Sequence, residues 1–241
     1  MTDHLLVLST SSVTEYLRCH HRYFLGHVYR MRGAQSVPAA IGQAVHAGVE
    51  AMHKGQPPEN ALQRAWDEES ANVPPEELAA DHEALADARK ILEVYRREVL
   101  PRFHPTLVEA PFAVKVEGII ISGTIDAADD DVHDTKTTAG KTINGRKPRF
   151  DAANYDLQLA LYKLGYKGLT GTWPKRTVLD VLTRRGTYRE IEREPSVRDA
   201  LDVVGVVRDG LARGDFEPTG ALNGACNWCA YAIRCAYAKT E

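Results

Sequence analysis

Apolar and polar residues recur along this chain with two different periods, and the change of period predicts where helices give way to strands. Apolar residues at helical spacing dominate the first hundred residues, with a loop expected at Pro74-Pro75. From Thr106 the residues alternate instead, which indicates a strand. The expected helices are 9–25, 38–55, 83–99, 151–168 and 196–213, and the expected strands are 106–116, 119–126, 132–136, 178–183 and 188–192. This order of elements predicts an α/β protein.

The stretch Gly118–Lys136 reads as a β-hairpin, because two β-branched runs flank three consecutive aspartates that favour a turn. If the turn centres on Asp130, Asp126 lies opposite Asp134, with Cβ atoms about 5 Å apart. The two-residue repeat of a strand then puts Asp134 and Lys136 on the same face. The hairpin is therefore predicted to gather two carboxylates and one ammonium group, while the aspartates at its tip are expected to be solvent-exposed.

Two carboxylates at this distance repel each other unless a cation or a proton lies between them. Asp126 and Asp134 are both embedded in apolar strand sequence, where a free charge would be costly. A divalent metal bound by both carboxylates is the favoured interpretation. Lys136 would then orient a water molecule or neutralise charge that forms on a phosphate.

The helix expected over residues 38–55 carries a second candidate ligand. Gly42, His46 and Glu50 recur at four-residue spacing and so share one face. A glycine one turn before the histidine allows another element to approach the helix closely. We therefore expect His46 to join the hairpin carboxylates as a metal ligand and Glu50 to lie outside the ligand set.

Composition places the chain among ordinary globular proteins, with 44 % hydrophobic and 26 % charged residues in 241. The formal net charge of −3 does not indicate nucleic-acid binding, so any such role depends on local basic patches. The apolar run at the N-terminus is too short for a secretion signal, and no membrane-spanning stretch is found. A cytoplasmic protein is expected.

The four cysteines form an unequal group: Cys226, Cys229 and Cys235 lie close together, whereas Cys19 precedes them by about 200 residues. Two disulfides are disfavoured in a reducing compartment. Four thiolates around a metal centre are favoured, and both zinc and an iron–sulfur cluster accept four cysteines. A zinc site more often takes its cysteines as two close pairs.

Four short motifs occur in a fixed order, and together with the cysteines they carry a resemblance to a known family. The motifs are G-x3-H ending at His46, GTID ending at Asp126, D-x-K at Asp134–Lys136, and Q-x3-Y at Gln158–Tyr162. This set resembles the RecB-like branch of the PD-(D/E)XK nucleases. The cysteine arrangement is similar to the iron–sulfur subset, which includes CRISPR-associated exonucleases, the AddB nuclease domain and phage-encoded proteins.

The resemblance implies a role for each matching residue. His46, Asp126, Asp134 and the carbonyl of Thr135 would bind the metal, and Lys136 would be catalytic. Gln158 and Tyr162 would position DNA or the catalytic carboxylates. Two carboxylates and an imidazole suit Mg²⁺ or Mn²⁺. Cys19, Cys226, Cys229 and Cys235 would bind a 4Fe–4S cluster.

The resemblance also implies a fold and an activity for the whole chain. The expected fold is a restriction-endonuclease-like mixed sheet flanked by helices, with a helical N-terminal part and a C-terminal cysteine clasp. The chain would be one nuclease domain, residues 1–241, with a helical insertion at about 56–105. The expected function is a metal-dependent DNA exonuclease in recombination, repair or replication, acting on single-stranded DNA or single-stranded ends with recombination or replication protein partners.

Two alternatives remain open: a non-catalytic DNA-binding recombination partner of the same fold, and a zinc–thiolate interaction module whose aspartates are only surface charge. DNA binding through phosphate contacts would require a basic track. The candidates for it are Arg18, Arg22, Lys141, Arg146, Lys147, Arg149, Lys175, Arg176, Arg184 and Arg185.

Overall fold

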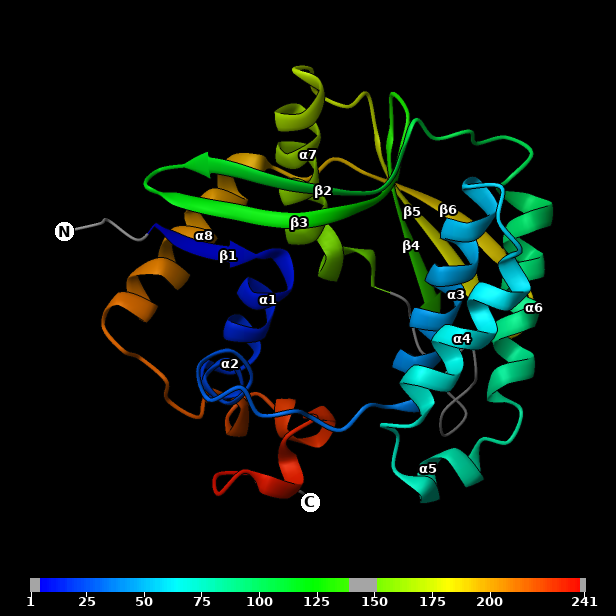
Figure 1. Cartoon of the computed structure of the whole chain (residues 1–241). Helices are drawn as coiled ribbons and strands as arrows, with labels where there is room; N and C mark the ends of the chain where they lie inside the picture. Colours follow the sequence, from blue (N-terminus) through cyan, green and yellow to red (C-terminus); the bar gives the residue numbers. More distant parts are fainter. Residues whose placement is uncertain (1–4, 139–150, 239–241) are drawn as a thin grey trace.

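The computed structural model describes residues 5–138 and 151–238. Its six strands form one mixed sheet (Figure 1). Five of them follow one another in the order β1-β3-β4-β5-β6, and the sixth, β2, pairs with β3. The strands β1 and β5 run parallel to their partners β3 and β4, whereas the other neighbours are antiparallel. The bounds are β1 Leu6–Ser9, β2 Leu107–Val116, β3 Ile119–Ala128, β4 Val132–Thr138, β5 Thr177–Thr183 and β6 Tyr188–Arg193.

Helices cover both faces of this sheet. They are α1 Thr10–Arg18, α2 His20–Tyr23, α3 Val37–His53, α4 Pro58–Ser70, α5 Pro75–Ala80, α6 Ala84–Glu98, α7 Asp156–Thr170 and α8 Val197–Ala212. Short π- and 3₁₀-helical turns lie at Phe24–Val28, Ala152–Tyr155, Thr219–Ala221, Ala225–Trp228 and Ala232–Arg234. In the described part of the chain, no helix has the length and apolar character needed to cross a membrane.

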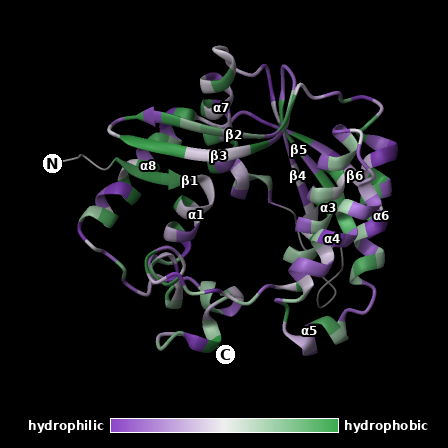
Figure 2. Ribbon diagram, viewed as in Figure 1, coloured by the Kyte–Doolittle hydropathy of each residue, from purple (hydrophilic) through white to green (hydrophobic). Residues whose placement is uncertain are grey.

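Three hydrophobic clusters pack against the two faces of the sheet. Helices α3, α4 and α6 pack together on one face, where their core includes Leu182 of β5. Leu179 and Val181 point to the other face and contact Leu159 of α7. A larger core joins α1, α7 and α8 to strands β1–β3. Figure 2 shows the hydrophobic residues concentrated in β1 and β3, whereas α4 and α6 alternate hydrophobic and hydrophilic residues.

The N-terminal region differs from the expectation of one helix over residues 9–25. Residues 6–9 instead form β1, parallel to β3, and α1 ends at Arg18. Cys19 has an extended backbone, with φ −167° and ψ 119°, so it lies at a break between α1 and α2 rather than within a helix. This break turns the chain toward its C-terminal segment.

The hairpin between β3 and β4 has the predicted register. Ala127 pairs with His133, and Ala128 pairs with Val132. Antiparallel pairing ends after these two pairs, because β4 continues alongside β5 in parallel. Asp126 and Asp134 therefore lie one step beyond the last pair, and not within the ladder as the hairpin prediction required.

The two ends of the chain are fastened together in a unit that we call the cysteine clasp, residues 16–34 and 218–238. The Asn223 side chain donates to the carbonyl of Arg18 at 3.0 Å, and the amide of Ala34 donates to the carbonyl of Ala230 at 2.9 Å. A Cβ on Gly220 would lie 3.0 Å from the Cβ of Cys19, so the glycine allows this close approach without displacing the cysteine.

Candidate active site

Asp134 and Lys136 form a buried ion pair on β4. Asp134 is fully buried, and Nζ of Lys136 lies 2.9 Å from its Oδ1 and 2.8 Å from its Oδ2. Burial raises the pKa of Asp134 to about 6, with Lys136 opposing and Asp126 reinforcing the shift. Burial opposes the charged form of Lys136, but Asp134 and Asp126 outweigh it and raise the pKa of the lysine. The ammonium group is therefore held in its charged form beside two carboxylates.

Asp126 connects this ion pair to α3. Its Oδ2 accepts a hydrogen bond from the backbone N–H of Thr135 at 3.0 Å and lies 3.5 Å from Nδ1 of His46. A Cβ on Gly42 would lie 3.3 Å from Oγ1 of Thr137, so the glycine lets α3 approach β4 closely. The close approach expected from the spacing of Gly42 and His46 is present in the structure.

Helix α7 brings Gln158 and Tyr162 to the same place. Nε2 of Gln158 donates a hydrogen bond to the hydroxyl of Tyr162 at 2.8 Å. Burial, followed by the charges of Asp126 and Asp134, raises the pKa of Tyr162, so its hydroxyl shares the surroundings of both carboxylates. The side chains that the motifs singled out thus come together from α3, β3, β4 and α7. Glu50 instead pairs with Lys54 one turn away, outside this group.

Glu109 joins this group, although the motifs did not single it out. Glu117 and Gly118 both have positive φ, 48° and 80°, and form the two-residue turn that sets the register of β2 and β3. This register places Glu109 opposite Asp126. The backbone of Glu109 is itself left-handed, with φ 46°. The sequence did contain a signal for Glu109. It is an acidic residue within a mostly apolar strand, and pairing the two strands back from the Glu117-Gly118 turn would have placed it opposite Asp126.

The donor atoms of the site fit a divalent cation. One atom from each of His46, Glu109 and Asp126 lies within 4.8 Å of the other two. Burial, then Asp126, raises the pKa of Glu109 to about 7, with His46 opposing the shift. Oδ2 of Asp134 is buried and accepts no hydrogen bond, although the Lys136 ammonium is nearby. The close approach of the carboxylates is a feature that a bound cation would stabilise.

Substituting Glu109 by glutamine should weaken metal activation, because it removes one negative charge beside Asp126 and keeps the side-chain volume. Loss of a group that supports metal ligands typically costs about 10- to 100-fold in metal affinity. We expect the Mn²⁺ concentration for half-maximal activity to rise at least about tenfold. Calorimetric titration with Mn²⁺ provides the second measurement. Glu117→Gln, an exposed change in the adjoining turn, is the control, and an unchanged titration curve for Glu109→Gln would exclude a role in metal binding.

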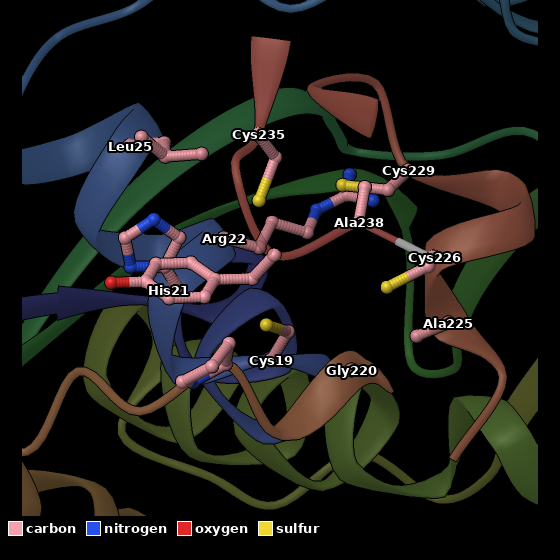
Figure 3. A pocket seen from close by; sticks show the side chains of 12 residues that line it. Cys19, His21, Arg22, Leu25, Gly220, Ala225, Cys226, Cys229, Cys235 and Ala238 are labelled. Atoms are coloured by element: carbon pink, nitrogen blue, oxygen red, sulfur yellow. The ribbon is translucent and has the colours of Figure 1, made fainter. Parts of the chain in front are cut away.

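The four cysteines line one pocket in the clasp, together with His21 and Arg22 (Figure 3). Figure 3 shows the Cys19, Cys226 and Cys235 side chains pointing toward a shared space, and none of the four cysteines forms a disulfide. A tetrahedral zinc site with Zn–S bonds of about 2.3 Å requires sulfurs roughly 3.8 Å apart. No three cysteine sulfurs within residues 5–138 and 151–238 come within 4.8 Å of one another. The sulfurs of the described residues therefore do not form a closed zinc site as they stand.

Several basic residues of the predicted DNA track are engaged in ion pairs. Arg184 is buried and pairs with Asp81 and Asp87, so it fastens β5 to the helices on that face and cannot contact DNA. Arg176 pairs with Asp131 at 2.6 Å and Lys175 pairs with Asp130 at 2.6 Å. The negative charges of Asp130 and Asp131 at the hairpin tip are thus partly neutralised by these two basic residues. Lys141, Arg146, Lys147 and Arg149 lie outside the described residues.

Comparison with known proteins yields a family and a fold. A family model described as the PD-(D/E)XK nuclease superfamily matches residues 7–236. A proposed exonuclease from Eubacterium rectale aligns with 98 % of this chain and 90 % of its own, at 16 % identity and a TM-score of 0.65. SSO0001 aligns with 97 % of this chain and 87 % of its own, at 17 % identity and a TM-score of 0.48. No curated protein sequence matches significantly. The similarity to the first of these structures confirms the predicted fold of this chain, a restriction-endonuclease-like mixed sheet flanked by helices.

Proposed function

The chain belongs to the PD-(D/E)XK nuclease superfamily, and from that premise we propose that it is a divalent-metal-dependent deoxyribonuclease. The observation that carries this proposal is the convergence of His46, Asp126, Asp134 and Lys136 at one partly buried site. We propose further that it acts as an exonuclease in DNA recombination, repair or replication, with protein partners from those processes. Its substrate would be single-stranded DNA or DNA with a single-stranded end.

In this proposal His46, Asp126, Asp134 and the carbonyl of Thr135 hold Mg²⁺ or Mn²⁺. When bound, the ion would polarise the scissile phosphate and lower the pKa of a water molecule. Lys136 orients the attacking water and offsets charge that develops on the phosphate oxygens. Its ion pair with Asp134 supports this role, since the pair fixes the ammonium nitrogen within 2.9 Å of a carboxylate oxygen.

Gln158 and Tyr162 are assigned a positioning role. Their mutual hydrogen bond fixes the tyrosine hydroxyl near both carboxylates. The amide oxygen of Gln158 is directed by the same bond, and either group could orient a carboxylate or a substrate phosphate. Burial of the tyrosine ring, which is 5 % exposed, keeps this orientation fixed.

We also propose that Cys19, Cys226, Cys229 and Cys235 hold a 4Fe–4S cluster with a structural role. The four cysteines that line one pocket support this assignment. The chain would then be a single nuclease domain in which α4, α5 and α6 form a helical insertion at about residues 56–105. The contacts of α4 and α6, which are mainly with α3 and with the adjacent face of the sheet, support that reading.

The direct test is cleavage of end-labelled single- and double-stranded DNA with Mg²⁺, Mn²⁺ or a chelator. We expect metal-dependent release of short products from an end, and no cleavage with the chelator. Circular DNA without ends serves as the control for exonuclease action. DNA binding without metal-dependent cleavage would favour a non-catalytic DNA-binding partner. Absence of both DNA binding and cleavage would favour a zinc–thiolate interaction module.

A further inference from the structure

The cysteine clasp has a charge distribution unlike the rest of the chain. Residues 16–34 and 218–238 contain no aspartate or glutamate, although the chain as a whole has 33 acidic residues and a net charge of −3. The clasp contains five arginines, namely Arg18, Arg22, Arg30, Arg32 and Arg234. The clasp is therefore rich in arginine, and the acids that pair with it, Glu15 and Asp215, lie just outside its bounds.

Most of these arginines are free to meet an external anion. Arg18, Arg30, Arg32 and Arg234 are exposed, and none forms an ion pair with an acid in the described ranges. Arg22 alone pairs, with Glu15 at 3.3 Å. Outside the clasp, Arg176, Arg184 and Arg193 are paired with carboxylates, whereas Arg185 and Arg189 are exposed and have no ion pair in the described ranges.

The cysteine clasp also exposes several large apolar side chains to solvent. Trp228 is 86 % exposed, although it stands between Cys226 and Cys229 on a tight turn held by a 3.1 Å backbone hydrogen bond between those two cysteines. Tyr29, Leu222, Ile233 and Tyr237 are also exposed. An indole fixed on a rigid turn presents a flat stacking face without losing much conformational entropy.

We propose that the cysteine clasp binds the single-stranded part of a DNA substrate, with a base stacked on Trp228 and phosphates on Arg30 and Arg32. This inference rests on the proposed nuclease function and names a surface for its substrate. Aromatic faces and unpaired arginines are the two components of non-specific single-strand binding. An exposed base face is available in a single strand but not within a duplex, which commits the proposal to single-stranded DNA.

The chain path connects this surface to the nuclease site. Residues 29–36 leave the clasp at the hydrogen bond between Ala34 and Ala230 and lead directly into α3, which carries His46 (Figure 1). Arg30 and Arg32 lie on this connecting segment. Phosphates bound there would follow the chain from the clasp toward the helix of the metal site.

Binding of fluorescent oligothymidylate to the full, cluster-containing protein in chelator measures the interaction without cleavage. Trp228→Ala should weaken binding about tenfold, equivalent to roughly 1.4 kcal/mol. The double variant Arg30→Ala/Arg32→Ala should lower the salt dependence by about 1.4 units of log K per log salt, or ~0.7 for each phosphate contact. Trp173→Ala and Arg189→Ala/Arg198→Ala, which are exposed and lie outside the clasp, are the matched controls.

A second measurement locates the base directly. An oligonucleotide that carries 5-iodouracil should cross-link on irradiation to the peptide that contains Trp228, as identified by mass spectrometry. Unchanged affinity for both clasp variants, or cross-linking only elsewhere, would overturn the proposal. Cleavage by the wild-type protein is measured separately, so a protein that cuts DNA but ignores these substitutions rejects the clasp surface and leaves the proposed nuclease function standing.

Discussion

Substituting Lys136 by alanine should abolish DNA cleavage and leave the fold intact. Removing one preorganised donor from a reacting oxygen typically costs 100- to 1,000-fold in rate, and Nζ of Lys136 lies 2.8 Å from Asp134. Loss of one partner usually leaves a costly buried charge. Here Asp134 can take up a proton instead, because burial already raises its pKa to about 6. We therefore expect a folded and inactive protein.

The measurement is single-turnover cleavage of end-labelled DNA, with thermal unfolding to verify the fold. Lys115→Ala, an exposed lysine change on β2, is the control and should cut at the wild-type rate. Asp126→Ala and Asp134→Ala should also be inactive while retaining DNA affinity. Near wild-type activity in any two of these three site variants would refute the assignment of the active site.

Substituting Cys19 by alanine should remove iron, thermal stability and activity together. A ligand set that joins Cys19 to Cys226, Cys229 and Cys235 closes nearly the whole chain into one loop. The loop-closure estimate for a crosslink over about 100 residues is roughly 4.7 kcal/mol, and it grows slowly with length. Metal–thiolate bonding adds to the free energy of folding. Loop closure and metal–thiolate bonding together are therefore comparable to the free energy of unfolding of a typical protein, ~5–15 kcal/mol.

Anaerobic purification, iron analysis, the visible absorption spectrum and thermal unfolding test this expectation. The wild-type protein should be brown, and Cys19→Ala should be colourless and less soluble. His21→Ala changes the same pocket without removing a thiolate and should keep its iron. A colourless wild-type protein with one zinc ion and full stability would show that the cluster assignment is wrong.

The part of the site that lies on one hairpin could be predicted from the sequence. Three aspartates between β-branched runs determine the turn, and the turn determines which residues of β3 and β4 face each other. The glycine-to-histidine spacing on α3 likewise indicated a close contact, which the structure shows between Gly42 and β4. These inferences succeeded because they depend on local geometry with a fixed period.

The features that escaped prediction depend on partners distant in sequence. The strand β1 is only four residues long, and it forms because β3 offers it a parallel edge. The break at Cys19 is stabilised by contacts with the C-terminal segment, including the hydrogen bond from Asn223 to Arg18. Arg184 looked like a surface cation until α6 and its neighbours supplied two carboxylates. Local propensity contains no information about any of these contacts.

The clasp also sets an order of events during protein synthesis. The hydrogen bond between Arg18 and Asn223 joins residues 205 positions apart, so it cannot form until the last segment has left the ribosome. At about 5–20 residues per second, translation separates the two halves of the clasp by roughly 10–40 s. Every strand of the sheet is already synthesised by then. All the strands that the sheet needs are therefore present in the nascent chain before Cys226, Cys229 and Cys235 can meet Cys19.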